Sequence, residues 1–465
     1  MNRQTQQLGA TEHRPARVPS RSICLRGGAV GCLAAALLVF AEPVFAETVR
    51  LTAEIAAARA VEVSNLAAAA AERTAAARAS ATAADAATMP QLSASAAVAR
   101  RSSVPEFELP IQLPGIGGLV LMPDITTTYA TGVRAQQALY AGGAISDQRV
   151  AARDDLDAAE ASRLATIADL RLAGQVAYWE EVRSSARVEL AHAQEDRAQR
   201  LLTDTQALLD AGMAVNADLL AARERLASAR VQVINADAGA ANALDELRSL
   251  LNLAPDATIE LADTLTGKLP DPPASSTELQ QQALARRPEL RASAAEIAAL
   301  AARARVAGTP TKPSLGAVAQ WDYNRPNQRY FPQLDEWKAS WSVGLVASWT
   351  LFDGGKAASD SSATTAMQRA AEQERGELQR RIAVEVQTDA RRAASALAAA
   401  TAADVARAAA EERERAARER HAAGLAAMAE VLDAEAALAA AEQQQVDTRA
   451  AAWLAAATLA RTVGQ

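Results

Sequence analysis

An internal duplication constrains the fold of this chain more than any other feature of its sequence. The segment Leu139-Tyr140-Ala141-Gly142-Gly143 returns as Leu351-Phe352-Asp353-Gly354-Gly355, at an offset of 351 − 139 = 212 residues. The same offset pairs Gly132 with Gly344 and Gly212 with Gly424, and the register continues without a gap. A chain with this pattern builds one structural unit twice.

A segment with a period of two residues leads into the second glycine pair. From Trp341 to Leu351 every second residue is apolar, and the residues between are small or polar except for Val346. This alternation predicts a strand with one apolar and one polar face. Trp341 and Trp349 would lie about 26 Å apart on the apolar face, which suits the two aromatic girdles of an outer-membrane barrel. A half-buried strand of a soluble sandwich has the same pattern, so both interpretations stand at this point.

Three further segments, residues 91–99, 126–139 and 314–322, alternate in the same way and predict strands. Residues 100–124 read as a long loop rich in proline and glycine, and residues 323–337 as a loop rich in asparagine, proline, arginine and aromatics. Aromatic residues concentrate around the last two strands, which favours a membrane-interface belt. The aromatics expected at this interface are Tyr129, Trp321, Trp341 and Trp349.

The distribution of proline predicts two long helical hairpins. All 17 prolines lie outside residues 124–254 and 333–465, and proline costs about 3 kcal/mol inside a helix. Helix-forming sequence fills both windows, and the first run corresponds to about 100 Å of helix. The long helices are expected over 144–210 and 356–420, and the returning helices over 217–253 and 428–461.

Tight turns at residues 211–216 and 423–428 connect the helices of each hairpin. In the first turn we expect Gly212 to end the long helix and Asn216 to cap the returning one. Each repeat also begins with a helix, so the expected organisation has four parts. These are a signal peptide over 1–46, a first repeat over 47–254 (helix over 47–87, two strands, hairpin), a connection over 255–277 and a second repeat over 278–465 (helix over 278–306, two strands, hairpin).

The N-terminal segment has the layout of a secretory signal peptide. Arginines at 14, 17, 21 and 26 precede an apolar run over 29–40, and Val44-Phe45-Ala46 offers small residues for cleavage. Both cysteines, Cys24 and Cys32, lie in this leader, so the expected mature chain has no disulfide and no cysteine metal site. Lipidation at Cys32 is an alternative, but the apolar run follows this cysteine instead of preceding it.

Four strands are too few to close a barrel, and an open sheet edge is untenable in lipid. The expected fold is therefore mainly α with a membrane β-barrel part contributed by several copies. Three copies of four strands each give a 12-stranded trimeric barrel, which the long helices continue as an α-helical barrel.

Composition argues against nucleic-acid binding and against catalysis. The net charge is −7, and basic residues of the expected mature chain are interleaved with acids. Outside the leader only His192 and His421 remain, on separate helices, and no phosphate-binding glycine loop is present. We therefore expect no enzyme, no cofactor, no metal and no nucleic-acid partner.

Three motifs together resemble the TolC-like outer membrane efflux proteins. They are Leu351-Phe352-Asp353-Gly354-Gly355 at the end of a strand, Ala285-Arg286-Arg287-Pro288-Glu289-Leu290 at a helix start, and Ala423-Gly424-Leu425 followed by Glu430-Val431-Leu432-Asp433-Ala434-Glu435. The resemblance covers essentially the whole expected mature chain. It implies a homotrimeric exit duct in the outer membrane, extending into the periplasm, for efflux or type I secretion. The partners would be outer-membrane lipid, a periplasmic adaptor (membrane fusion protein) and an inner-membrane pump.

The resemblance also implies roles for residues near the two turns. The turns form the tip that contacts the adaptor, which here involves Gly212, Met213, His421, Gly424 and Leu425. The acids just beyond the turns constrict the periplasmic entrance, and the matching residues are Asp218, Glu430 and Asp433. Three copies of such acids around an axis would favour cations. The alternative is that Glu430, Asp433 and Glu435 are ordinary solvated helix residues.

The sequence departs from the family pattern at two positions of the second turn. Ala426 stands where an arginine commonly helps to lock the closed tip, and His421 stands in place of an aromatic residue. The entrance is therefore expected to be held in another way. Two other classes of protein remain as alternatives: a secreted coiled-coil or adhesin-like protein, and a periplasmic adaptor subunit.

Overall fold

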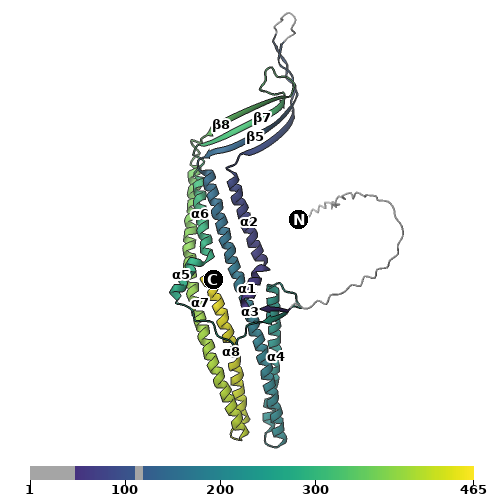
Figure 1. Cartoon of the computed structure of the whole chain (residues 1–465), viewed down its shortest axis with the longest axis vertical. Coiled ribbons are helices and arrows are strands. Elements are labelled where there is room, and N and C mark those ends of the chain that lie inside the picture. Colours follow the sequence, from purple (N-terminus) through teal and green to yellow (C-terminus); the bar gives the residue numbers. More distant parts are fainter. Residues whose placement is uncertain (1–47, 110–118) are drawn as a thin grey trace, which may run out of the picture. The chain divides into compact units, whose positions relative to one another are not determined.

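The computed structural model describes residues 48–109 and 119–465. The expected signal peptide, with Cys24 and Cys32, lies outside these ranges. The first half of the chain contains two short helices, a β-hairpin and a long helical hairpin (Figure 1). Its elements are β1 (Thr48–Leu51), α1 (Ala53–Glu62), α2 (Asn65–Ala86), β2 (Gln91–Arg100), β3 (Phe107–Leu109), β4 (Leu119–Met122), β5 (Thr127–Ala141), α3 (Ala144–Asp210) and α4 (Asn216–Leu250).

The second half repeats this order without a counterpart of β3 and β4, so the duplication seen in the sequence is also present in the fold. Its elements are β6 (Thr258–Leu261), α5 (Ser276–Arg286), α6 (Pro288–Ala307), β7 (Ser314–Arg325), β8 (Lys338–Ser348), α7 (Lys356–Ala422) and α8 (Met428–Val463). The helices α3 and α7 each contain 67 residues. Each follows its strand through a glycine pair with positive φ, which is +62° and +94° at Gly142 and Gly143 and +71° and +86° at Gly354 and Gly355.

Several local predictions were wrong. Residues 48–51 form a strand instead of the start of a helix, and they pair in parallel with β6, inside the expected proline-rich connection. The helix expected over 47–87 is also interrupted, because Ser64 caps a new helix by accepting a hydrogen bond from the Leu66 N–H. The helix expected over 278–306 is broken before Pro288, whose ring cannot continue α5.

The strand region differs from the predictions in three places. The loop expected over 100–124 contains the β3–β4 hairpin. The strand β7 extends to Arg325 and takes up the first residues of the expected loop 323–337. The strand β8 ends at Ser348, so Trp349 to Leu351 lie beyond it.

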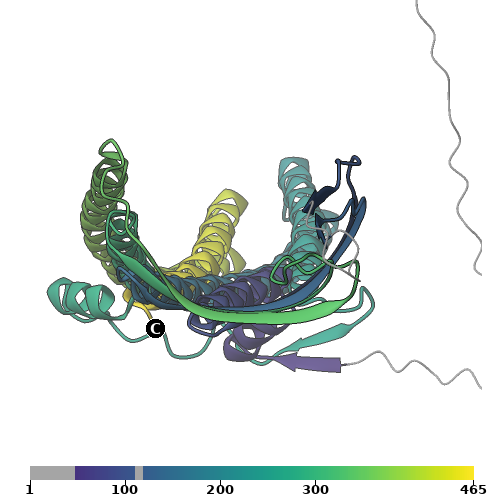
Figure 2. The same ribbon diagram turned by 90° about the horizontal axis from the view of Figure 1, so that it is seen from above.

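Four strands form one antiparallel sheet in the order β2-β5-β7-β8. Trp341 lies opposite Trp321, which lies opposite Val133, so the predicted apolar residues share one face. This face is exposed: Trp341 is 70% accessible, Val343 72% and Leu345 69%. The opposite face carries polar pairs such as Arg134 and Gln320, joined by a 2.8 Å hydrogen bond. Figure 2 shows this sheet as a curved strip.

Alanine and glycine let the helices of the bundle pack closely. A Cβ added at Gly174 of α3 would lie 2.7 Å from the Ala56 carbonyl oxygen and 2.9 Å from the Ala57 Cα on α1. The aromatic core is small: Trp179 of α3 stacks on Trp453 of α8, with ring centroids 4.7 Å apart. Within residues 48–109 and 119–465, none of the helices has the combination of length and apolar character that a membrane span requires.

Candidate functional site: the helical tips and the exposed sheet

The two turns at the end of the helical hairpins have the same geometry. Gly212 has φ +75° and Gly424 has φ +72°, which is the left-handed conformation of a helix C-terminus. The Met213 N–H donates to the Leu208 carbonyl and the Leu425 N–H donates to the Arg420 carbonyl, both at 2.8 Å. This hydrogen bond ends each long helix in the same way, and Gly212 is the helix terminator that was predicted.

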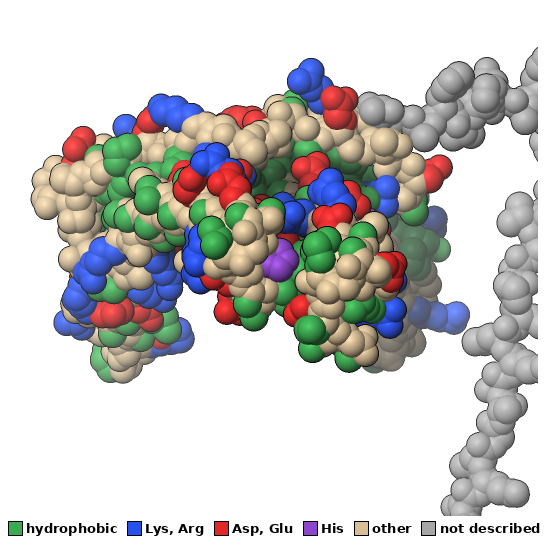
Figure 3. Space-filling view, turned by 90° about the horizontal axis from the view of Figure 1, so that it is seen from below, with side chains coloured by type: hydrophobic (Ala, Val, Ile, Leu, Met, Phe, Trp, Pro, Cys, Tyr) green, Lys and Arg blue, Asp and Glu red, His purple; other side chains and the backbone are tan. Residues whose placement is uncertain are grey.

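Both turns expose large apolar side chains. Met213 is 72% accessible and Leu425 is 73% accessible. Figure 3 shows the end of the molecule where the turns lie, with hydrophobic side chains next to acidic and basic ones. Exposed apolar side chains beside charged ones are also found on surfaces that bind other proteins.

The returning helix of the first hairpin is capped by Asp218 instead of Asn216. Asn216 is already the first residue of α4, and Val215 occupies the cap position. The Asp218 carboxylate accepts a hydrogen bond from the Val215 N–H at 3.2 Å. An acid in the first turn also interacts favourably with the helix dipole. Asp218 therefore has a local structural role, and its role at the entrance stays a prediction.

The acids of the second hairpin differ from each other in their surroundings. Glu430 pairs with Arg420 across the turn at 2.5 Å, and both side chains are partly exposed. Asp433 is exposed and forms no ion pair with any residue in the described ranges. Because Arg420 partly compensates the charge of Glu430, Asp433 presents the less compensated carboxylate.

His421 binds within its own turn. Its Nδ1 lies 2.9 Å from the Ala426 carbonyl oxygen, so the two departures from the family pattern contact each other. This contact braces the turn, and it does not reach the other hairpin.

Glu435, by contrast, is buried, and the solvated-residue interpretation is wrong for this side chain. It is 7% accessible and accepts a hydrogen bond from Arg418 at 2.6 Å. Burial raises the pKa of the Glu435 carboxyl, and the neighbouring Arg418 opposes this shift. Sequence reasoning missed this burial, although the alanines and leucines around Glu435 on α8 form an apolar stripe.

A series of polar contacts joins the first hairpin to α8 above the tip. Arg187 pairs with Asp447 at 2.5 Å and Arg197 pairs with Glu442 at 2.5 Å. Lower on the hairpin, the Arg225 guanidinium lies 3.5 Å from the Glu435 carbonyl oxygen. These contacts hold the two hairpins together within one chain.

The predicted interface aromatics lie on the exposed sheet, with one exception. Tyr129, Trp321 and Trp341 belong to β5, β7 and β8, whereas Trp349 follows β8 and donates from its Nε1 to the Thr311 carbonyl at 2.9 Å. The sequence analysis did not include Trp337 among these aromatics. Its ring stacks on Tyr323 with centroids 5.1 Å apart, and its centroid lies 5.7 Å from that of Tyr129. A continuous row of rings runs through Tyr129, Trp337, Tyr323 and Trp321, whose ring lies 6.2 Å from that of Tyr323. This row lies at the end of the sheet opposite the helices, and Trp349 is not part of it.

The family model of the outer membrane efflux protein matches residues 58–253 and 279–465. The chain belongs to the outer membrane efflux protein family. The two matched segments fall on the two repeats, and they leave out the whole connection over 255–277. As a member of this family, the chain is an outer-membrane efflux protein. The resemblance carried by the three sequence motifs is thereby confirmed.

Solved structures agree with this membership at the level of the fold. The outer-membrane channel OprN is 21% identical with a TM-score of 0.70, over 89% of each chain. CusC is 18% identical with a TM-score of 0.73, over 89% of this chain and 92% of its own. VceC of Vibrio cholerae is 19% identical with a TM-score of 0.72, over 89% and 96%. No curated protein matches the sequence.

Proposed function

We propose that three copies of this efflux protein form the exit duct of a tripartite efflux pump or type I secretion system. The observation that carries the proposal is the sheet. Its apolar face is exposed, neither of its edge strands β2 and β8 pairs with a further strand in the described part of the chain, and β5 and β8 each precede a 67-residue helix. Open edges are untenable in lipid, and 12 antiparallel strands from three copies would remove them. Three pairs of helical hairpins would continue the passage into the periplasm.

The division of the chain follows from this proposal. Residues 1–46 would direct export, residues 47–254 and 278–465 would each contribute two strands and one hairpin, and residues 255–277 would connect them. The parallel pairing of β1 with β6 supports a joint role for the two repeats, because it joins the start of the first to the connection.

The partners and the entrance residues belong to the same proposal. A periplasmic adaptor coupled to an inner-membrane pump would bind the tip through Gly212, Met213, His421, Gly424 and Leu425. The exposed apolar surface of Met213 and Leu425 supports this assignment. Asp218, Glu430 and Asp433 would form acidic rings at the entrance, while Tyr129, Trp321, Trp341 and Trp349 would contact outer-membrane lipid. The duct would need no cofactor and would carry out no catalysis.

Single-channel conductance in a planar bilayer tests the duct and its entrance together. We expect cation-selective openings from the purified trimer, and reduced selectivity from the Glu430→Ala/Asp433→Ala variant. Openings with unchanged selectivity would show that Glu430 and Asp433 do not contribute to cation selectivity and are solvated helix residues. A protein that neither opens nor forms trimers would contradict the proposed trimeric duct.

A further inference from the structure

The free edge of β8 can be assigned from one side-chain contact. The Ser314 Oγ of β7 donates to the Ser348 carbonyl at 3.2 Å, so that the Ser348 carbonyl faces β7. Carbonyl directions alternate along a strand. The carbonyls at odd-numbered positions, from Ala339 to Ala347, therefore face the edge that carries no strand in the described chain.

The chain itself occupies the outer part of this edge. The Tyr330 hydroxyl donates to the Ala339 carbonyl at 2.9 Å, and the Arg329 guanidinium donates to the Trp341 carbonyl. Both residues belong to the segment that connects β7 to β8. Two carbonyls that a neighbouring strand would otherwise use are thus already hydrogen-bonded.

Asn327 anchors this segment. It is 3% accessible, and its side-chain amide donates to the Lys338 carbonyl and to the Ser340 Oγ, both at 2.9 Å. Its Oδ1 accepts from the Arg329 N–H at 3.0 Å, which orients the following residues. We call Asn327, Arg329 and Tyr330 the edge cap.

The inner part of the edge, Val343 to Ser348, has no hydrogen bond to the edge cap. The strands of the sheet alternate in direction, so β2 runs antiparallel to β8, and β2 forms the opposite free edge. A second copy would therefore bring its β2 to β8 in the antiparallel arrangement that the rest of the sheet uses. Its apolar residues, including Leu92 and Ala94, would extend the exposed face of β8.

We propose that the edge cap divides the free edge of β8 in two: Val343–Ser348 binds β2 of a second copy, and the cap ends this pairing at Trp341. The inference rests on the proposed trimeric barrel and specifies its subunit seam. In lipid an unpaired backbone group finds no water to bond with, so the inner edge needs a strand partner. At the outer end Arg329 and Tyr330 supply hydrogen bonds without a strand, and the seam can stop there. A capped edge also protects the monomer from extended, incorrect pairing.

Disulfide crosslinking between copies tests this division, because the expected mature chain has no cysteine of its own. Leu345→Cys probes the inner edge and Ala339→Cys probes the capped edge, each combined in turn with one cysteine in β2. The β2 positions share the face of both probes; they are Leu92, Ala94, Ala96 and Val98. Facing residues on paired strands have Cβ atoms within disulfide range.

We expect Leu345→Cys to give crosslinked oligomers with at least one β2 cysteine and Ala339→Cys to give none. In the Arg329→Ala/Tyr330→Phe background the Ala339→Cys crosslinks should appear, since both capping hydrogen bonds are lost. Gln328→Ala, at an exposed neighbour in the same segment, is the matched control and should leave the pattern unchanged.

Three results would overturn the division of the edge in a protein that native mass spectrometry shows to be trimeric. The first is that Ala339→Cys forms crosslinks while the edge cap is intact. The second is that Ala339→Cys still forms no crosslinks in the Arg329→Ala/Tyr330→Phe background. The third is that Leu345→Cys forms no crosslink with any β2 position. A monomer by mass spectrometry would instead overturn the proposed trimer, and the seam with it.

Discussion

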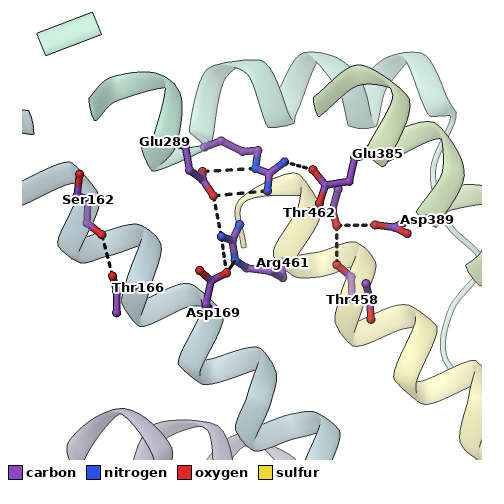
Figure 4. A network of polar contacts seen from close by, with 10 residues as sticks. Ser162, Thr166, Asp169, Glu289, Glu385, Asp389, Thr458, Arg461 and Thr462 are labelled. Atoms are coloured by element: carbon purple, nitrogen blue, oxygen red, sulfur yellow. Dashed lines mark hydrogen bonds and ion pairs between the residues drawn. The ribbon is translucent and has the colours of Figure 1, made fainter. Parts of the chain in front are cut away.

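The Arg461 guanidinium of α8 lies 2.7 Å from the Glu289 carboxylate of α6, and it also pairs with Asp169 of α3 at 2.6 Å (Figure 4). Arg461 is 8% accessible. Glu289 belongs to the Arg-Pro-Glu-Leu motif of the second repeat, and its neighbour Arg287 pairs with Glu385 of α7 at 2.5 Å. The motif thus joins α6, α7 and α8 of the second repeat to α3 of the first. Arg461 and Arg287 hold the pKa of Glu289 below its usual range, against the effect of burial.

Replacement of Arg461 by alanine should destabilise the folded chain by about 3–5 kcal/mol, because it leaves the largely buried Glu289 without its closest cation. Urea denaturation followed by circular dichroism measures this loss. Arg391→Ala, at an exposed arginine of α7, is the control and should stay within about 0.5 kcal/mol of the parent. Equal effects of the two substitutions would show that the network contributes nothing beyond surface charge.

Gly174→Ala should destabilise the chain by about 1–3 kcal/mol, since the added methyl group would meet the backbone of α1 at Ala56. Gly239→Ala provides the matched control within α4, where a Cβ has no neighbour within 4 Å. That substitution should stabilise the chain by about 0.5–1 kcal/mol through helix propensity. Thermal unfolding of both variants checks the opposite signs, and a gain at Gly174 would contradict the close approach of α1 and α3.

Glu181→Gln should stabilise the chain increasingly as the pH rises. Burial raises the pKa of Glu181 to about 7, although Ser184 and Arg248 lower it. Below the unfolded-state pKa of about 4.5 the carboxyl is protonated in both states and costs nothing. Between about pH 4.5 and pH 7 the unfolded chain releases this proton and the folded chain keeps it, so stability falls as the pH rises. Above the folded-state pKa the folded chain buries the charge, and the loss is complete at about 3 kcal/mol at most.

Unfolding midpoints of Glu181→Gln at pH 5 and pH 8 test this dependence. The difference from the parent should be small at pH 5 and largest at pH 8. Glu189→Gln, at an exposed position of the same helix, is the control. A difference that stayed the same at pH 5 and pH 8 would show that ionisation of Glu181 does not destabilise the folded chain.

The two acids of the second hairpin should contribute unequally to cation selectivity if the duct forms as proposed. Asp433→Ala should lower selectivity more than Glu430→Ala, because Arg420 already compensates Glu430. Arg420→Ala should raise selectivity by releasing that carboxylate. Reversal potentials in a salt gradient rank the three variants, and the opposite order for Asp433 and Glu430 would count against the ion pair in the open channel.

The sequence by itself determined the repeated architecture, because its signals are local. The absence of proline over 124–254 and 333–465 permits the 67-residue helices, and the period of two residues specifies which side chains share a face of the sheet. Gly212 and Gly424 end their helices because positive φ suits glycine. Each of these features depends on residues within a few positions of one another.

Only the tertiary structure decided which distant groups meet. Thr48 pairs with Thr258, and Arg461 meets Asp169 and Glu289; no local pattern encodes partners so far apart. Likewise, Glu435 and Asp433 look alike in the sequence, yet one is buried against Arg418 and the other is exposed. The burial of an acid depends on which side chains of the neighbouring helix it meets, and the packing of the helices decides that.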